Sequence, residues 1–416
     1  MSHDRSGKIV YMDNNATTRV APEVLEVMLP YFSELYGNPS SMHSFGGQVG
    51  KTLKTAREQI GALINGHPDE LILTSCGTES DSTAILSALQ ALPEKRHIVT
   101  TRVEHPAVKN LCEHLDKLTG HKHKVTMLPV GRDGTLDLKQ YEESLTDETA
   151  IVSVMWANNE TGVIFPVAEM AEIAKSRGIL FHTDAVQAVG KIPIDLKKVP
   201  VDFLSISGHK LHAPKGVGVL YVRKGTPYAP FLVGGHQEHG RRGGTENVAA
   251  IIGLGRACAL AAEHLERENT TVRGLRDRLE QGLLQAIPNA MLNGHPVLRL
   301  PNTANISFEY VEGEAILLHL DRYNICASSG SACTSGSLEP SHVLRAMGVP
   351  FTAAHGSIRF SLSIYNTEAE VDWVLEKLPP IIANLREMSP FWKGDHPGKV
   401  GGSQCACTCE PGPSSN

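Results

Sequence analysis

Val201-Asp202-Phe203-Leu204-Ser205-Ile206-Ser207 is a largely apolar run that leads directly into Gly208-His209-Lys210. Such a run is typical of a buried strand. A strand that ends in this way places the Lys210 amine beside a hydroxyl, an imidazole and backbone N–H groups. Desolvation and neighbours of this kind lower the pKa of a lysine, as a Schiff-base lysine requires. Because a lysine after a strand is more often a solvated surface group, the rest of the chain decides between the two interpretations.

The same strand-like pattern recurs through the first two thirds of the chain and alternates with helical stretches such as Val167–Ala174. Alternation of this kind predicts an α/β fold with a mostly parallel sheet, covered by helices on both faces. Ligands on such sheets bind at the carboxyl ends of the strands, so polar residues there are candidate site residues. The predicted strands besides the opening run are Glu70–Thr74, His97–Thr101, Ala150–Met155 and Ile179–Thr183.

The length of 416 residues exceeds one ordinary core, so two or three domains are expected. A long helical stretch from about 247 to 286 should leave the sheet domain and lead into a smaller α+β region. That region includes the strand-like runs Asn305–Glu309 and Ser357–Leu362. We therefore predict an N-terminal segment over 1–16 that packs with the small domain, a large domain over 17–260, a small domain over 261–393 and a disordered, cysteine-containing tail over 394–416.

Composition excludes several classes of protein. The chain is 41% hydrophobic and 20% charged, which is typical of a soluble globular enzyme. A net charge of -6 without a basic arm argues against nucleic acid as a partner. No apolar run looks long enough to cross a membrane, and the start of the chain lacks the apolar core of a secretory signal, so a cytoplasmic location is expected. The eight cysteines do not form a disulfide framework.

Three more motifs follow predicted strands. Thr74-Ser75-Cys76-Gly77-Thr78 leads into a helix that begins near Thr78, and the exposed N–H groups there predict either an anion site or a simple threonine N-cap. Asp184 lies just past an apolar strand, where it can bind a cationic ring nitrogen or cap a turn. His105 can stack on a flat ligand, move a proton or serve a structural role.

Together, these motifs place an anion site, a carboxylate, a flat-faced histidine and a buried amine at one sheet edge. They match what pyridoxal phosphate needs: a phosphate cradle, a partner for the pyridinium nitrogen, a ring stack and a lysine that binds the aldehyde. The combination predicts pyridoxal 5'-phosphate as the cofactor more strongly than any one motif does.

From about Tyr11 to Trp392, the chain resembles the cysteine desulfurases of the NifS/IscS group. These are class-V aminotransferase-type enzymes of fold-type I, with a seven-stranded, mostly parallel sheet in the large domain and a smaller α+β domain. Two motifs, Met155–Asn159 and Thr74–Thr78, are more similar to the nitrogen-fixation form, NifS, than to the housekeeping form. The other matching motifs are Tyr11–Thr18, Gly37–Ser41, Asn158–Gly162, Arg241–Asn247 and Ser328–Gly336.

The resemblance implies a role for each matching position. Lys210 would bind the cofactor as a Schiff base, Asp184 would pair with the pyridinium nitrogen and His105 would stack on the ring. Arg359 would bind the substrate carboxylate, and Asn158 would contact both substrate and cofactor. Asn158 and Gln187 would lie near the ring's 3-oxygen. The cofactor-binding set is completed by Gly77, Thr78, Gln187, Ser207, Gly208, His209 and, from the second subunit of a homodimer, Thr245.

Cys333 lies among glycine and serine residues in Ala327–Pro340, a composition that predicts a mobile loop. An isolated cysteine is often a small buried hydrophobe, but the neighbours here are not apolar, which favours a reactive thiol. The resemblance implies that Cys333 attacks the sulfur of L-cysteine and keeps it as a persulfide while alanine leaves. Cys333 is also a candidate transient iron–sulfur ligand. Cys326, by contrast, is predicted to pack.

The tail departs from the family pattern, since Cys405, Cys407 and Cys409 alternate with other residues. They can bind zinc or an iron–sulfur precursor, relay a persulfide, or be incidental.

The leading prediction is a desulfurase that supplies an iron–sulfur scaffold protein, with nitrogenase as the expected destination. A selenocysteine lyase or another class-V reaction is the alternative enzyme. A non-catalytic sulfur or metal carrier is the alternative from another class, although a carrier has no use for Lys210, Asp184 and Arg359.

Overall fold

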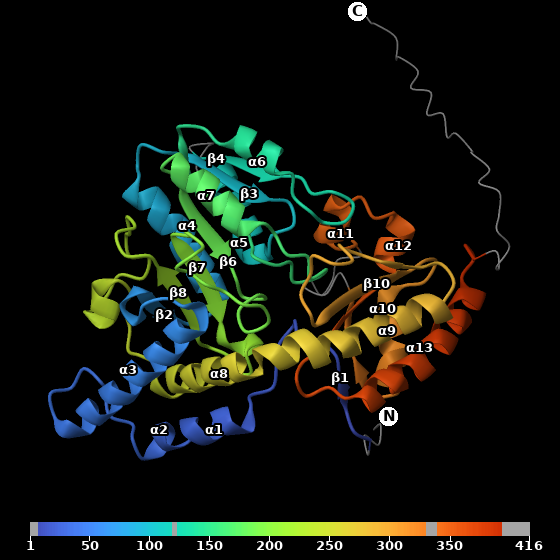
Figure 1. The fold of residues 1–416 in the computed structure, drawn as a ribbon, viewed down its shortest axis with the longest axis horizontal. Coiled ribbons are helices and arrows are strands. Elements are labelled where there is room, and N and C mark those ends of the chain that lie inside the picture. Colours follow the sequence, from blue (N-terminus) through green and yellow to red (C-terminus); the bar gives the residue numbers. More distant parts are fainter. Residues whose placement is uncertain (1–6, 119–122, 330–338, 393–416) are drawn as a thin grey trace, which may run out of the picture.

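The computed structural model describes residues 7–118, 123–329 and 339–392. Its largest element is a seven-stranded sheet in which only β8, among the described strands, runs antiparallel to its neighbours (Figure 1). The mostly parallel sheet predicted from the alternating pattern is therefore confirmed. Its strands, in spatial order, are β2 (Leu71–Thr74), β8 (Gly218–Val222), β7 (Phe203–Ser207), β6 (Leu180–Asp184), β5 (Thr149–Ser153), β3 (His97–Thr101) and β4 (Lys124–Leu128).

Helices cover both faces of this sheet, so its central strands are buried along their whole length. One apolar core lies beneath α4 (Gly77–Ala91) and α5 (Pro106–Leu118). A larger core on the other face lies beneath α3 (Ser44–Ile64), α7 (Val167–Ser176) and α8 (Val248–Arg267). Burial on both faces means that these central strands have no solvated face. The remaining helices of this region are α1 (Pro22–Met28), α2 (Pro30–Ser33) and α6 (Leu138–Ser144).

A second sheet forms the smaller α+β region with a core of its own. Its strands, in spatial order, are β12 (Ser328–Ser329), β13 (Ser357–Ser361), β10 (Thr303–Phe308) and β9 (Ala290–Leu292). The helices are α9 (Arg273–Ala286), α10 (Gly313–Asp321), α11 (His342–Ala346), α12 (Phe351–His355) and α13 (Glu368–Met388).

The N-terminal segment lies against this small region. Strand β1 (Val10–Tyr11) pairs in parallel with β11 (Ile325–Cys326), and Met12 is fully buried in the small core. Asp13 forms an isolated bridge to Ser361 at the end of β13. Residues 7–16 thus pack against the small region as expected of the N-terminal segment, while the domain boundaries themselves stay predictions.

The long helical stretch expected from about 247 to 286 is present as α8, a π-helical turn (Glu268–Val272) and α9 in succession. By length and composition alone, Val248–Ala286 would be long and apolar enough to cross a membrane, so the expectation that no run reaches that size is wrong. Half of the most apolar stretch of this helix is buried inside the protein, and α8 packs against α3. A core helix that joins two regions explains both its length and its apolar composition.

Two glycines on this helical stretch provide a matched test of the packing. A Cβ on Gly255 would lie 2.6 Å from Ala56 Cα on α3, whereas a Cβ on exposed Gly274 would meet nothing within 4 Å. We expect Gly255→Ala to destabilise the protein by about 1–3 kcal/mol because overpacking separates α8 from α3. Gly274→Ala should instead stabilise it by about 0.5–1 kcal/mol through helix propensity. Urea unfolding of both variants measures the difference, and equal shifts would contradict the close approach of the two helices.

Candidate active site

A cavity of about 370 Å³ opens where β3, β5, β6 and β7 of the large sheet end. This volume is within the usual range for a small-molecule site. Arg359 on β13 and Ser328 on β12 close it from the small region, and Asn15 and Ala16 close it from the N-terminal segment. The structure thus brings together, as lining residues, nine of the predicted positions: Gly77, Thr78, His105, Asp184, Gln187, Ser207, His209, Lys210 and Arg359.

Lys210 ends a short 3₁₀ turn, Gly208–Lys210, which follows β7 directly. Its Nζ donates to the carbonyl oxygens of Asn15 at 2.5 Å and Ala16 at 2.7 Å. The Lys210 amine is therefore partly buried and oriented by the N-terminal segment. The alternative interpretation, a solvated surface lysine, is wrong.

Asp184 is the last residue of β6, whereas the sequence placed it just after the end of that strand. Its side chain is buried. Oδ1 accepts a hydrogen bond from Val186 N at 2.9 Å. Burial raises the pKa of Asp184, although the hydrogen bond from Val186 N and the positive charge of Lys210 oppose this. A buried carboxylate in this position favours a cation, and a pyridinium N–H at the cavity wall would be one.

His105 follows β3 and lies beside the same cavity. Its Nδ1 accepts a hydrogen bond from Ala107 N at 3.1 Å, which makes Nδ1 an acceptor and leaves the proton of the neutral ring on Nε2. Burial lowers the pKa of His105 and so favours the neutral ring. A neutral, turn-anchored imidazole is suited to stacking on a flat aromatic ligand.

The start of α4 has the properties of a phosphate site. Its N-cap is Cys76, which forms no side-chain cap hydrogen bond, so the first N–H groups are open to an anion. A Cβ on Gly77 would come within 3.0 Å of Val186 Cγ2 and 3.4 Å of Ser207 Cβ. The alternative of a Thr78 N-cap is wrong, because Thr78 lies inside the helix. With Asp184 and Lys210, this cradle fits pyridoxal phosphate.

Arg359 is held from two sides before any substrate binds. Its Nη2 forms a 3.0 Å ion pair with Asp13, and its Nη1 donates to Asn159 O at 3.0 Å. The Nε atom is buried and has no hydrogen-bond partner among the described residues. A guanidinium fixed in this way at the cavity wall is suited to a carboxylate.

Three predicted positions lie outside this lining. In Asn158, Oδ1 accepts from Glu160 N and Thr161 N, and Nδ2 donates to Val103 O, so its contact with cofactor and substrate stays a prediction. Gly208 packs instead, since a Cβ there would lie 2.8 Å from Val217 Cγ1. Thr245 lines a separate cavity of about 170 Å³, so within one chain it does not reach this cavity.

Sequence reasoning missed two carboxyl groups beside Asp184. Asp81, on α4, lines the cavity and its Oδ1 has no hydrogen-bond partner among the described residues. Burial and the neighbouring Asp184 raise the pKa of Asp81. Glu104 accepts hydrogen bonds from Thr101 Oγ1 and Met155 N, and burial raises its pKa to about 8. The only signal in the sequence was that each lies within a few residues of a motif that follows a predicted strand.

Cys333 and the tail cysteines lie outside the described residues. The described chain on either side of 330–338 is anchored at the site: Ser328 lines the cavity, and Ser341 Oγ donates to Glu160 at 2.5 Å. His342 Nε2 lies 2.9 Å from Glu104 O. Within 7–118, 123–329 and 339–392, no group of three metal-ligating side chains occurs, so the metal prediction at Cys333 stays a prediction.

Glu160 predicts a pH dependence of stability. Burial raises the pKa of Glu160 from 4.5 to about 7, because the ionised form is costly to bury. The stability that the protonated side chain contributes is fully present below pH 4.5 and is lost as the pH rises through 7. Glu160→Gln should therefore gain about 3 kcal/mol relative to the wild type between pH 4.5 and pH 8. Urea unfolding at both pH values tests this; a constant difference would contradict it.

Comparison with known proteins supplies the family. The aminotransferase class-V family model matches residues 10–374. "Cysteine desulfurase NifS" of Azotobacter vinelandii is 61% identical over 389 residues, covering 93% of this chain and 96% of that relative. A solved "NifS-like protein" is 40% identical with a TM-score of 0.85, covering 91% of this chain and 100% of its own. A structure described as "SspA in complex with cysteine" is 34% identical with a TM-score of 0.74, covering 86% and 99%.

These similarities extend across both sheets and include the segments that form the cavity. The fold, the phosphate cradle and the strand-end carboxylate and lysine agree with the family's dependence on pyridoxal phosphate. The chain belongs to the aminotransferase class-V family of pyridoxal-phosphate enzymes and, within it, to the NifS-like cysteine desulfurases.

Proposed function

We propose that the protein converts L-cysteine to L-alanine and transfers the sulfur to Cys333 as a persulfide, which then supplies iron–sulfur cluster assembly. The observation that carries this proposal is one cavity lined by Lys210, Asp184 and Arg359, with the anchored ends of the Cys333 segment beside it. The names of the curated relatives support the substrate, and so does the solved relative described in complex with cysteine.

The residues of this chain divide the work of the reaction. The start of α4, with Ser207 and His209, would hold the phosphate, and the His105 ring would lie against the pyridine ring. Asp184 would hold the proton at the ring nitrogen, because a buried carboxylate stabilises a cation there. When bound, pyridoxal phosphate supplies the electron sink for the pair released from the substrate Cα–H bond. Lys210 Nζ would take that proton.

Arg359 and Cys333 complete the proposal. Arg359 would bind the substrate carboxylate with its guanidinium fork and so orient the substrate side chain towards the Cys333 segment. The Cys333 thiolate attacks the substrate sulfur. An S–S bond forms as the Cβ–S bond breaks, the bonding electrons pass to carbon, and Cβ takes up a proton to give alanine. Substrate and enzyme thiols together yield alanine and one persulfide, so the step needs no external oxidant.

We further propose that the active unit is a homodimer. Large apolar side chains are exposed on the described surface of the large domain, among them Leu25, Leu29 and Phe32 near α1 and α2. A second copy that covers such a surface would also bring Thr245 to the partner's phosphate, as the resemblance implies. Light scattering of the purified protein measures its oligomeric state. A monomer with full activity would contradict the proposal.

The physiological acceptor is proposed to be an iron–sulfur scaffold protein, with nitrogenase maturation as the destination. Similarity to a relative named NifS supports this assignment. Reconstitution separates the acceptor from the enzyme activity: a purified scaffold should acquire sulfur from the enzyme and L-cysteine. If the enzyme released alanine but transferred no sulfur to any scaffold, the acceptor assignment would fail and the desulfurase assignment would stand.

Incubation with L-cysteine, scored for alanine and sulfide, tests the main assignment against its alternatives. Equal amounts of alanine and persulfide plus sulfide are expected. A selenocysteine lyase would turn over L-selenocysteine and leave L-cysteine intact, and a non-catalytic carrier would release no alanine. Mass spectrometry of the tail after turnover decides on a relay through Cys405, Cys407 and Cys409: unmodified thiols there would exclude it.

A further inference from the structure

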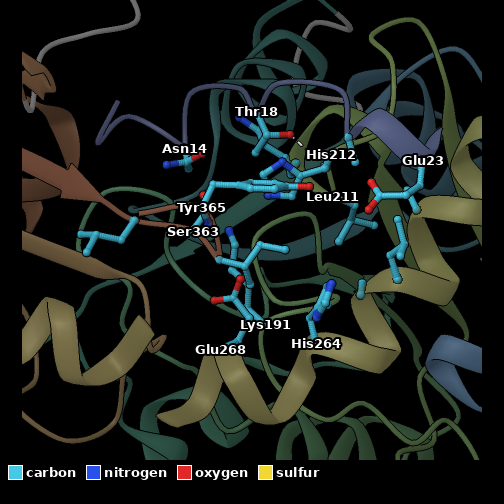
Figure 2. A pocket seen from close by; sticks show the side chains of 18 residues that line it. Asn14, Thr18, Glu23, Lys191, Leu211, His212, His264, Glu268, Ser363 and Tyr365 are labelled. Carbon is cyan, nitrogen blue, oxygen red and sulfur yellow. Dashed lines mark hydrogen bonds between the residues drawn. The ribbon is translucent and has the colours of Figure 1, made fainter. Parts of the chain in front are cut away.

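A second buried lysine lies directly behind the catalytic pocket. Lys191 is only 6% exposed and lines a separate small cavity that Lys210 also borders (Figure 2). Glu268 and Tyr365 line the same cavity. Its volume of about 40 Å³ has room for about three water molecules but not for a substrate. The function of Lys191 must therefore be sought in the groups that it contacts.

Hydrogen bonds connect Lys191 to the catalytic pocket. Its Nζ donates to Gln187 Oε1 at 2.8 Å and lies 3.4 Å from Asn15 Oδ1. Gln187 Nε2 in turn donates to Asn15 O at 3.0 Å. The same carbonyl oxygen accepts from Lys210 Nζ. Lys191, Gln187, Asn15 and Lys210 thus form one connected chain between the two cavities.

The chemistry of an ammonium group fixes the orientation of the Gln187 amide. A protonated lysine has three donors and no acceptor, so the amide must present Oε1 to it and turn Nε2 away. One N–H of Nε2 is used by Asn15 O, and the second remains for the catalytic pocket that Gln187 lines. We propose that Lys191 is a positioning residue that holds Gln187 with an N–H directed at the cofactor's 3-oxygen. This inference rests on the proposed function and on the contact of Gln187 with that oxygen which the family resemblance implies.

The consequence for the cofactor is electrostatic. An N–H donor stabilises the anionic form of the 3-oxygen, whereas a carbonyl oxygen in its place would repel it. A neutral amine at position 191 can accept as well as donate, so it no longer forces the amide to one orientation. The Lys191 ammonium therefore reinforces the orientation of Gln187 that the acceptor Asn15 O also favours, with an N–H towards the cofactor.

Glu268 favours the positively charged form of Lys191. Burial lowers the pKa of Lys191 to about 7, the charges of Lys210 and Arg359 lower it too, and the Glu268 carboxylate opposes them. Glu268 is buried, and its Oε2 accepts no hydrogen bond from the described residues. His209 and His212 also face this lysine, and burial keeps both histidines neutral with pKa values of about 4. Burial also raises the pKa of Glu268 to about 7, while Lys191 and Arg267 lower it, so it is the ionised form of Glu268 that favours the ammonium.

The backbone places Glu268 through an unusual element. Glu268 opens the π-helical turn Glu268–Val272 between α8 and α9, and the next residue, Asn269, donates from Nδ2 to Lys191 O at 2.8 Å. π-Helical turns are rare and occur frequently at functional sites. Here the turn anchors the backbone of Lys191 through Asn269 and brings the Glu268 carboxyl group near enough to influence the Lys191 amine.

The test compares two ligands that differ in a single oxygen. The full-length apoenzyme is titrated with pyridoxal phosphate and with 3-deoxypyridoxal phosphate, and the ratio of the two Kd values measures the contribution of the 3-oxygen. In Lys191→Met, we expect the preference for pyridoxal phosphate to fall about fivefold, with little change for the deoxy analogue. If both ligands weaken equally, Lys191 only supports the fold and the proposal is overturned.

A double-mutant cycle distinguishes failure of this inference from failure of the assumed contact. Gln187→Leu should lose the same preference, and adding Lys191→Met to it should cause no further loss. If Gln187→Leu keeps the full preference, the Gln187 contact itself is wrong. If Gln187→Leu loses the preference and Lys191→Met keeps it, the contact stands and the positioning role falls.

Glu268→Gln provides a second variant in case Lys191→Met does not fold. The lysine remains, but without its anionic partner it should lose its proton at a lower pH. The preference for pyridoxal phosphate over the deoxy analogue should therefore decline at a lower pH than in the wild type. An unchanged pH dependence would overturn the proposal.

Discussion

Replacing Cys333 with serine should abolish formation of persulfide and sulfide, with a fall in kcat of at least about 10³-fold. A serine hydroxyl keeps the size of the side chain but is a poor nucleophile towards sulfur. The substitution leaves Lys210, Asp184 and Gly77 in the cavity unchanged, so the absorbance of bound pyridoxal phosphate should be retained. Alanine, sulfide and cofactor absorbance are measured on the same preparation.

Cys326→Ser is the matched control for this prediction. Cys326 lies on β11, is partly exposed and does not line the cavity, so its replacement should leave turnover within about twofold of the wild type. Sulfide release that survives in Cys333→Ser would assign the nucleophile elsewhere. Loss of cofactor absorbance in that variant would instead show damage to the site.

Lys210→Ala is expected to lose roughly 10³-fold in kcat/KM, because the amine that binds the cofactor and moves the Cα proton is gone. Lys210→Arg separates covalent chemistry from charge. It keeps a cation near Asn15 O and Ala16 O but cannot form a Schiff base, so it should be as inactive as the alanine variant.

The absorbance of the bound cofactor reports this loss independently of turnover. After treatment with borohydride, which reduces a Schiff base to a stable amine, both variants should still release pyridoxal phosphate on denaturation, whereas the wild type should retain it. Lys215→Ala, at an exposed lysine of the same segment, should behave as the wild type. Full activity in Lys210→Arg would mean that charge, and not covalent attachment, is what the site requires.

The parts of the site that follow strand ends were predictable from the sequence. Asp184 and Lys210 each end a buried apolar run, and parallel strands bring their carboxyl ends to one edge. The phosphate cradle was also visible as small residues at a helix start, although the helix begins at Gly77 and its N-cap is Cys76. These features depend on neighbours in the sequence.

The features that the sequence did not predict depend on contacts between distant segments. Asn158 belongs to a matching motif, yet its amide is used by backbone groups of its own turn and of the strand end at Val103. Asn15 meets Lys191 and Lys210 only because the N-terminal segment crosses the site. The partnership of Glu268 with Lys191 depends on a π-helical turn, which no local pattern predicts.

The central claim is that sulfur passes from L-cysteine to Cys333 with one alanine formed for each persulfide. It is tested most directly by a single turnover with sulfur-labelled L-cysteine, followed by peptide mass spectrometry and alanine quantification. The account predicts one labelled sulfur on the peptide that contains Cys333 for each alanine released, before any acceptor is added. Alanine formed in full with no label on Cys333 would contradict it.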